Sequence, residues 1–177
     1  VFPTNAVALH QAIGASKKTG ILDINANCSG MITGLDQASR YLMANPSMKR
    51  VLLVGSDASS LIMDPSDTIT YPNFGDCAVA VILEKTEEEG TGLVDTMYYT
   101  ESSDVDKVTF PKNGLSKNLQ GRGVVDYVQW IPFPGDVSIE RATEMIKELI
   151  IRNGLTTEQV NAYCFSQFSI GNIHRLR

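Results

Sequence analysis

The sequence contains little of what marks membrane-inserted, secreted or nucleic-acid-binding proteins. No apolar run approaches the length that spans a bilayer, and no charged segment followed by an apolar one opens the chain as a signal peptide would. The three cysteines are irregularly spaced, so they predict no disulfide framework and suit a reducing cytosol. A net charge of −5 argues against nucleic acid as the main partner. We therefore expect a cytoplasmic protein whose partners are neither a membrane nor a nucleic acid.

Metal-ligating residues are also scarce. The chain has two histidines, and no cysteine has a histidine or second cysteine nearby at the spacing of a zinc site. Asp64, Asp67 and Asp76 share no metal-ligand spacing, so a loop surface with a structural turn is the simpler interpretation. Gly121-Arg122-Gly123 lacks the flanking strand and helix of a dinucleotide-binding loop. The sequence thus predicts neither a metal nor a tightly bound cofactor.

The composition is that of an ordinary globular protein, with 43% apolar and 20% charged residues over 177 positions. This length suffices for one sizeable core. The chain begins at Val1 without an initiator Met, and it ends on a helix-like pattern at 173–177 that has barely started. We expect a piece of a longer chain.

Hydrophobic periodicity predicts alternating strands and helices, hence an α/β protein. A strand at 21–25, a helix at 29–44 and a strand at 51–55 have the spacing of a right-handed βαβ unit with parallel strands. The helix carries few charges and should be largely buried, with Gly30 and Gly34 allowing close packing. The other expected elements are helices at 4–14 (capped by Thr4) and 136–153, strands at 77–83, 93–100 and 160–165, a turn at 156–159 and an irregular stretch at 101–135.

Cys28 stands between the first predicted strand and the helix that follows it. The unpaired N–H groups and the dipole at a helix N-terminus favour the thiolate form of a cysteine placed there, and small residues on both sides leave room for a substrate. A nucleophile on a strand-to-helix turn is typical of acyl-transfer enzymes. The alternative is a small buried core residue, which is how we interpret Cys77 and Cys164 within their apolar runs.

Three segments of the sequence form a set whose order and spacing are more specific than any one of them alone. Residues 25–35 read NANCSGMITGL, residues 51–57 read VLLVGSD, and residues 73–80 read NFGDCAVA. In this order they resemble the active-site segment, the next core strand and the Phe-Gly-Asp-Gly-Ala segment of the β-ketoacyl-ACP synthase III (KAS III) family, with Cys77 at the usual glycine. The residues FPT at 2–4 also fit the segment that precedes the family's first helix of this region. The resemblance favours Cys28 as nucleophile over a packing residue.

The resemblance implies a thiolase-like α/β fold with mixed sheets and a buried central helix, present only in part. Residues 1–100 would be the nucleophile-bearing remainder of the N-terminal half, and residues 101–177 an incomplete C-terminal half. It also implies a condensing enzyme or acyltransferase, in which Cys28 takes an acyl group from acyl-CoA and passes it to malonyl-ACP or another acceptor. The partners would be acyl-CoA, acyl carrier protein and a second subunit in a homodimer, and CoA would be part of a substrate rather than a cofactor.

The sequence departs from the family where the family places Pro-His-Gln-Ala-Asn. Residues 165–169 read FSQFS, so Ser166 stands at the histidine and Ser169 at the asparagine, while Gln167 keeps the glutamine. In the family, that histidine stabilises charge on the thioester carbonyl during decarboxylation. A serine offers one neutral O–H and carries no proton near neutral pH. An alignment shifted by one position would let Gln167 fill the space, but it restores no histidine.

The expected site residues follow from these segments. A catalytic role is expected for Cys28, Ser166 and Gln167, and substrate binding for Phe74, Gly75, Ser169 and Asn172. His10 is expected on the solvent-facing side of the first helix, and His174 is either a solvated helix end or part of a basic docking site for the carrier protein. Two alternative functions remain: a catalytically reduced partner subunit, and an acyltransferase that forms C–O or C–N bonds without decarboxylation.

Overall fold

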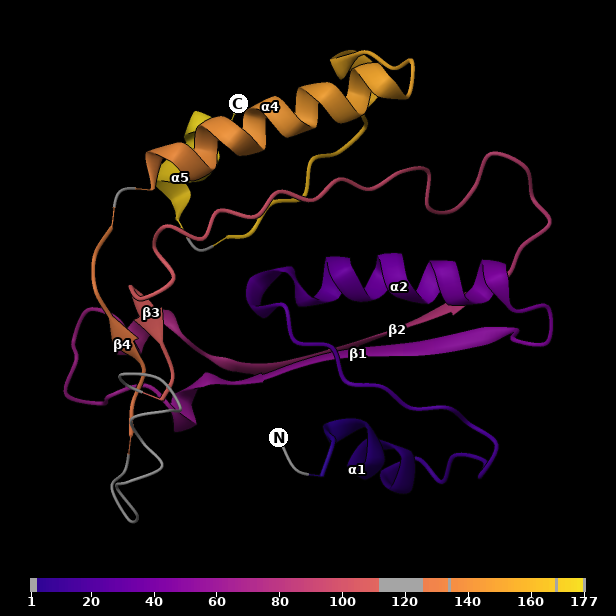
Figure 1. Cartoon of the computed structure of the whole chain (residues 1–177), viewed down its shortest axis with the longest axis horizontal. Helices are drawn as coiled ribbons and strands as arrows, with labels where there is room; N and C mark the ends of the chain where they lie inside the picture. The colour runs from indigo at the N-terminus through magenta and orange to yellow at the C-terminus, as the bar shows by residue number, and fades with distance from the viewer. Residues whose placement is uncertain (1–2, 112–125, 134, 168, 177) are drawn as a thin grey trace. The chain divides into compact units, whose positions relative to one another are not determined.

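The computed structural model describes residues 3–111, 126–133, 135–167 and 169–176 (Figure 1). Gly121-Arg122-Gly123 and part of the expected irregular stretch lie outside the described residues. The chain divides into two compact units, one formed by Val1–Gly55 with Ala80–Glu89 and the other by Ser56–Val79 with Gly90–Arg177. The domain boundary expected at residue 100 stays a prediction.

The first unit begins with α1 (Asn5–Ala12), close to the predicted helix. Thr4 occupies the N-cap position with an extended backbone, but its side chain makes no capping hydrogen bond. The Asp23 carboxylate instead accepts hydrogen bonds from the backbone N–H groups of Asn5 and Ala6, at 2.7 and 2.9 Å. A side chain distant in sequence therefore satisfies two of the amides that a helix N-terminus leaves without an intrahelical partner.

His10, near the end of α1, is half-buried rather than solvent-exposed as expected. Its Nε2 atom lies 2.9 Å from the carbonyl oxygen of Ser16. The chain folds back after the helix and brings this carbonyl to the imidazole, which periodicity within one helix does not reveal.

The central helix α2 (Gly30–Ala44) packs on the strand β1 (Arg50–Ala58), and both elements confirm the predicted ones (Figure 1). A methyl group at Gly34 would lie 2.6 Å from Cδ1 of Leu53, which is closer than van der Waals contact allows. Glycine at this position therefore sets how closely the helix approaches the strand.

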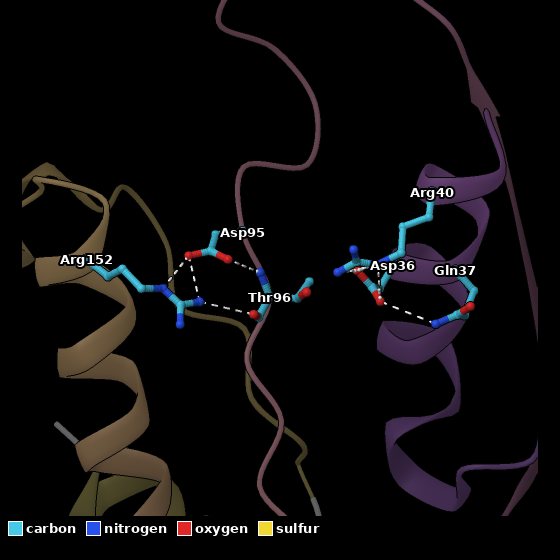
Figure 2. A network of polar contacts seen from close by, with 6 residues as sticks. All are labelled: Asp36, Gln37, Arg40, Asp95, Thr96 and Arg152. Carbon is cyan, nitrogen blue, oxygen red and sulfur yellow. Dashed lines mark hydrogen bonds and ion pairs between the residues drawn. The ribbon is translucent and has the colours of Figure 1, made fainter. Parts of the chain in front are cut away.

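Burial along α2 is partial. Ala38 and Leu42 are each 5% exposed, whereas Met43 is 80% exposed, so the expectation of a largely buried helix is met on one side only. Asp36 is 1% exposed, and the Nε atom of Arg40 donates to both of its carboxylate oxygens, at 2.9 and 3.0 Å (Figure 2). Arg40 supplies the countercharge that a buried carboxylate requires.

The strand β1 pairs with β2 (Asp76–Glu84) in a two-stranded sheet. The backbone N–H of Lys85 donates to the carbonyl oxygen of Lys49 at 3.2 Å, and the Arg50 guanidinium lies 2.7 Å from Glu84 Oε1. The beginning of β1 thus lies beside the end of β2, which is the antiparallel arrangement.

Residues 21–25, 93–100 and 160–165 are irregular rather than the predicted strands. The predicted βαβ unit with parallel strands is therefore wrong, because its first strand is absent from the described structure. A segment becomes a strand only where a neighbour completes its backbone hydrogen bonds, and an apolar pattern does not specify that neighbour.

The interpretation of Cys77 and Cys164 as core residues is also wrong, because both side chains are exposed. Cys77 lies on β2, most of whose residues are exposed. Burial of an apolar strand requires a second layer over its face, and the pattern of the strand alone does not provide one.

The second unit contains the remaining elements. The helix predicted at 136–153 is present, and Gly135 holds its N-cap position. Arg175 forms an ion pair of 2.5 Å with Asp136. Among them are the antiparallel pair β3 (Val108–Thr109) and β4 (Gln129–Trp130), the helix α4 (Asp136–Arg152), the short turn η4 (Thr157–Gln159) with a capping box, and the helix α5 (Ile170–Arg175).

Asp95 joins the irregular segment at 93–100 to the end of α4. Its Oδ2 atom accepts hydrogen bonds from Arg152 Nε at 2.7 Å and from Asn153 Nδ2 at 2.9 Å, and Arg152 Nη2 also donates to the carbonyl oxygen of Thr96 at 3.1 Å (Figure 2 shows the Arg152 contacts). These donors, Asn153 foremost and then Arg152, lower the pKa of Asp95 below its usual range.

The mixture of helices and sheets confirms the expected α/β class. Within the described residues, no helix combines the length and the apolar character needed to cross a membrane.

The contact between Gly34 and Leu53 predicts the effect of a larger side chain in α2. Gly34→Val should lower the free energy of unfolding by about 1–3 kcal/mol, because the added atoms overlap Leu53. Urea denaturation measures the change. Gly30→Val is the matched control, since a side chain there meets no atom within 4 Å. Adding Leu53→Ala to Gly34→Val should recover part of the lost free energy of unfolding, because it removes the overlapping atoms. If the double variant recovers none of it, the overlap with Leu53 is not the cause.

The depressed pKa of Asp95 predicts how stability depends on pH. Because the folded state favours the charged carboxylate, Asp95 stabilises the fold above its unfolded pKa of about 3.9, and this contribution is lost as pH falls through the lower folded value. Asp95→Asn should therefore destabilise the chain in urea at pH 7, with a difference from wild type that shrinks toward pH 2. Glu144→Gln, which breaks an exposed pair with Arg141, should change little at any pH. A constant difference for Asp95→Asn across this range would contradict the assignment.

Candidate active site

Cys28 lies in the short turn η1 (Asn27–Ser29), directly before α2. Its side chain is exposed, which is incompatible with the alternative of a buried packing residue. Ser29 is the N-cap of α2, so the cysteine stands one residue outside a helix of 15 residues.

The chain reaches Cys28 through a turn that contains two asparagines. Asn27 has a φ of 47°, in the left-handed region that Asn tolerates better than most residues. Its backbone N–H donates to Oδ1 of Asn25 at 3.4 Å, and the N–H of Ser29 donates to the carbonyl oxygen of Ala26 at 3.0 Å. The Asn-x-Asn spacing is the sequence signal for this turn, which hydrophobic periodicity does not detect.

Phe74 and Gly75 lie at the end of the loop between β1 and β2, in the second unit. Asp76 closes this loop, because its carboxylate accepts hydrogen bonds from the backbone N–H of Ser60 at 2.9 Å and from the Ser60 hydroxyl at 2.5 Å. The Ser60 hydroxyl, and then its backbone N–H, lower the pKa of Asp76. The Phe74 ring meets the Trp130 ring edge to face, with centroids 6.1 Å apart.

Ser166, Gln167, Ser169 and Asn172 lie along the segment that leads into α5. Ser166 and Gln167 are exposed and belong to neither a helix nor a strand. Ser169 is the N-cap of α5, and its hydroxyl oxygen accepts a hydrogen bond from the backbone N–H of Asn172 at 3.3 Å. The Ser169 side chain therefore caps α5, and the expected contacts of Ser169 and Asn172 with substrate stay predictions.

Cys28 belongs to the first unit, and the other six predicted site residues belong to the second. Within the second unit they form two groups, Phe74 with Gly75 on one loop and the remaining four on another segment. The arrangement of these groups around Cys28 stays a prediction. His174 is exposed in α5, and neither of its expected roles is tested.

Two cavities of about 310 and 210 Å³ lie between residues 99–104 and the first half of α4. None of the predicted site residues lines either of them. In the part of the chain that the structure describes, no three His, Cys, Asp or Glu side chains are grouped so that they could hold a metal ion.

Comparison with known proteins connects this chain to one family. The family model described as 3-Oxoacyl-[acyl-carrier-protein (ACP)] synthase III matches residues 22–102, which include Cys28, Phe74 and Gly75 but not Ser166. A protein of Chlorobium luteolum named Beta-ketoacyl-[acyl-carrier-protein] synthase III is 34% identical over 166 residues, which are 91% of this chain and 50% of that protein. Proteins of the same name from Solibacter usitatus and Rickettsia rickettsii are 31% and 27% identical, with 90% and 99% of this chain covered, and 50% and 53% of those proteins.

The fold agrees with these sequence matches. A crystal structure at 2.1 Å of a 3-oxoacyl-(acyl-carrier-protein) synthase III matches all of this chain and 56% of that chain, with a TM-score of 0.84 and 20% identity. At this identity the match shows the fold alone, and it confirms the expected thiolase-like architecture. The chain spans about half the length of the curated relatives it matches. In sequence and in fold, the chain is therefore similar to proteins named β-ketoacyl-[acyl-carrier-protein] synthase III.

Proposed function

We propose that this chain carries the nucleophile of a KAS III-like acyltransferase. The observation on which this rests is the exposed Cys28 at the start of α2, inside the segment that the family model matches. The proposed partners are acyl-CoA, an acyl carrier protein and a second copy in a homodimer, in a cytoplasmic pathway of fatty acid biosynthesis. The reaction requires no metal or tightly bound cofactor.

The proposed reaction has two steps. First, the Cys28 thiolate attacks the carbonyl carbon of the acyl-CoA thioester, the new carbon–sulfur bond forms, and CoA leaves as its thiolate. The backbone N–H of Cys28 is the proposed donor to the oxyanion. Second, malonyl-ACP loses CO₂, and the resulting carbanion attacks the acyl-enzyme carbonyl. A carbon–carbon bond forms as the carbon–sulfur bond to Cys28 breaks.

The serine at position 166 affects the second step and not the first. Loading of Cys28 requires a thiolate and an oxyanion donor near the acyl carbonyl. Decarboxylation requires stabilisation of the charge on the malonyl thioester, and losing one such donor typically costs about a hundred- to a thousandfold in rate. We therefore propose efficient loading and slow decarboxylation.

Two alternatives follow from the same serine. An acyltransferase that forms C–O or C–N bonds needs no decarboxylation, so Ser166 would not impair it. A catalytically reduced partner subunit would not need the histidine either, but the exposed thiol at a helix N-terminus favours an enzyme.

The three exposed cysteines allow a test of the nucleophile within one molecule. Cys28 should react with iodoacetamide at pH 7 about tenfold faster than Cys77 or Cys164, because only Cys28 lies at a helix N-terminus. Peptide mass spectrometry gives the three rates, and Cys77→Ser and Cys164→Ser serve as controls that leave the fast reaction in place. Equal rates at all three thiols would contradict the nucleophile and support the partner-subunit alternative.

Introducing a histidine at residue 166 or 167 tests which of these positions corresponds to the family's histidine. Ser166→His should leave loading from acetyl-CoA unchanged and raise CO₂ release from malonyl-ACP by about a hundred- to a thousandfold. Gln167→His is the matched control for a misaligned position, because both side chains are exposed in the same segment. If CO₂ release rises in Gln167→His and not in Ser166→His, the family's histidine position corresponds to residue 167 rather than 166. No gain in either variant would favour the acyltransferase without decarboxylation.

A further inference from the structure

Asp23 joins the segment that leads to Cys28 to the helix α1. Its two carboxylate oxygens accept one hydrogen bond each, from the first and second amides of α1. Both bonds are short, at 2.7 and 2.9 Å, and they join residues 18 and 17 positions apart. The Thr4 side chain, which would normally cap this helix, makes no such bond. Asp23 therefore fixes a point of the chain against α1.

The strand that the sequence predicts at 21–25 would have held this segment by further backbone hydrogen bonds, but it is absent from the described structure. Residues 21–26 form no strand, so no ladder of backbone hydrogen bonds holds them. The printed sequence has only four residues between Asp23 and Cys28. Two of these, Asn25 and Asn27, form the turn with the left-handed φ. Because the connecting segment is short and its turn restricts it, a displacement of Asp23 should also displace the Cys28 thiol.

We propose that Asp23 is a positioning residue for Cys28. By holding the N-terminus of α1, its carboxylate fixes the segment 24–27 and with it the direction from which the sulfur meets an acyl carbonyl. This inference rests on the proposed function of Cys28 as the nucleophile. Small displacements of a reacting group cost rate rather than affinity, because the attack geometry is lost while the binding contacts remain.

The test compares variants at two residues placed at the N-terminus of α1, Asp23 and Thr4, in the chain of 177 residues. Asp23→Ala removes both acceptors, Asp23→Asn keeps one acceptor oxygen, and Thr4→Ala removes a side chain that makes no capping bond. The first readout is the single-turnover rate of Cys28 acylation by acetyl-CoA, measured against acetyl-CoA concentration. The second is the ratio of iodoacetamide labelling at Cys28 to that at Cys77 in the same molecule.

We expect Asp23→Ala to lower the acylation rate at saturating acetyl-CoA about tenfold, with a change of less than about twofold in the half-saturating concentration. Asp23→Asn should lower this rate by about threefold, and Thr4→Ala should leave it at the wild-type value. The labelling ratio should change in the same order. Thermal unfolding followed by circular dichroism reports the folded fraction of each variant, so that a loss of rate from unfolding is separated from a loss of position.

Asp23→Ala acylated at the wild-type rate, or slowed only in proportion to its unfolded fraction, would overturn the proposal. If Asp23→Ala does not fold, Asp23→Asn decides, and a wild-type rate and ratio in that variant would overturn it. A wild-type chain that is not acylated at all would overturn the proposed function instead. In that case the labelling ratio still tests whether Asp23 positions the thiol.

Discussion

The packing of α2 on β1 is the constraint on which the candidate site depends. Cys28 lies just outside the N-terminus of α2, so the position of the helix sets the position of the thiol. Gly34 allows the helix to approach Leu53 more closely than any side chain would. Because Gly34, Leu53 and Cys28 all lie in the first unit, this relation between core packing and the thiol is contained within one compact part of the chain.

Carboxylates hold the irregular segments of this chain where backbone ladders do not. Asp23 bonds the segment before Cys28 to α1, and Asp95 bonds the segment 93–100 to the end of α4. Asp76 closes the loop that carries Phe74 and Gly75 by two hydrogen bonds from Ser60. Charged acceptors form stronger hydrogen bonds than neutral ones. One carboxylate with two such bonds can therefore hold a segment that has no row of backbone hydrogen bonds.

The sequence predicted the parts of this structure that depend on local pattern. The amphipathic period places α4 and α2 to within a residue or two, and the residues around Cys28 carry the resemblance to the family whose model matches there. The predictions that were wrong depend on a partner elsewhere in the chain. Three apolar runs are not strands because no neighbour pairs with them in the described structure, and Cys77 and Cys164 are exposed because no layer covers them. Asp23 was missed, because a bond between residues 18 positions apart leaves no periodic signal.

The proposed division between loading and decarboxylation rests on two expectations from the sequence, that Cys28 is the nucleophile and that Ser166 stands at the family's histidine. The most direct measurement is to incubate the chain with radiolabelled acetyl-CoA and to locate the label by digestion and mass spectrometry. The account predicts that the label is found on the peptide containing Cys28, as a thioester that hydroxylamine releases. An unlabelled chain, or a label spread equally over Cys28, Cys77 and Cys164, would contradict it.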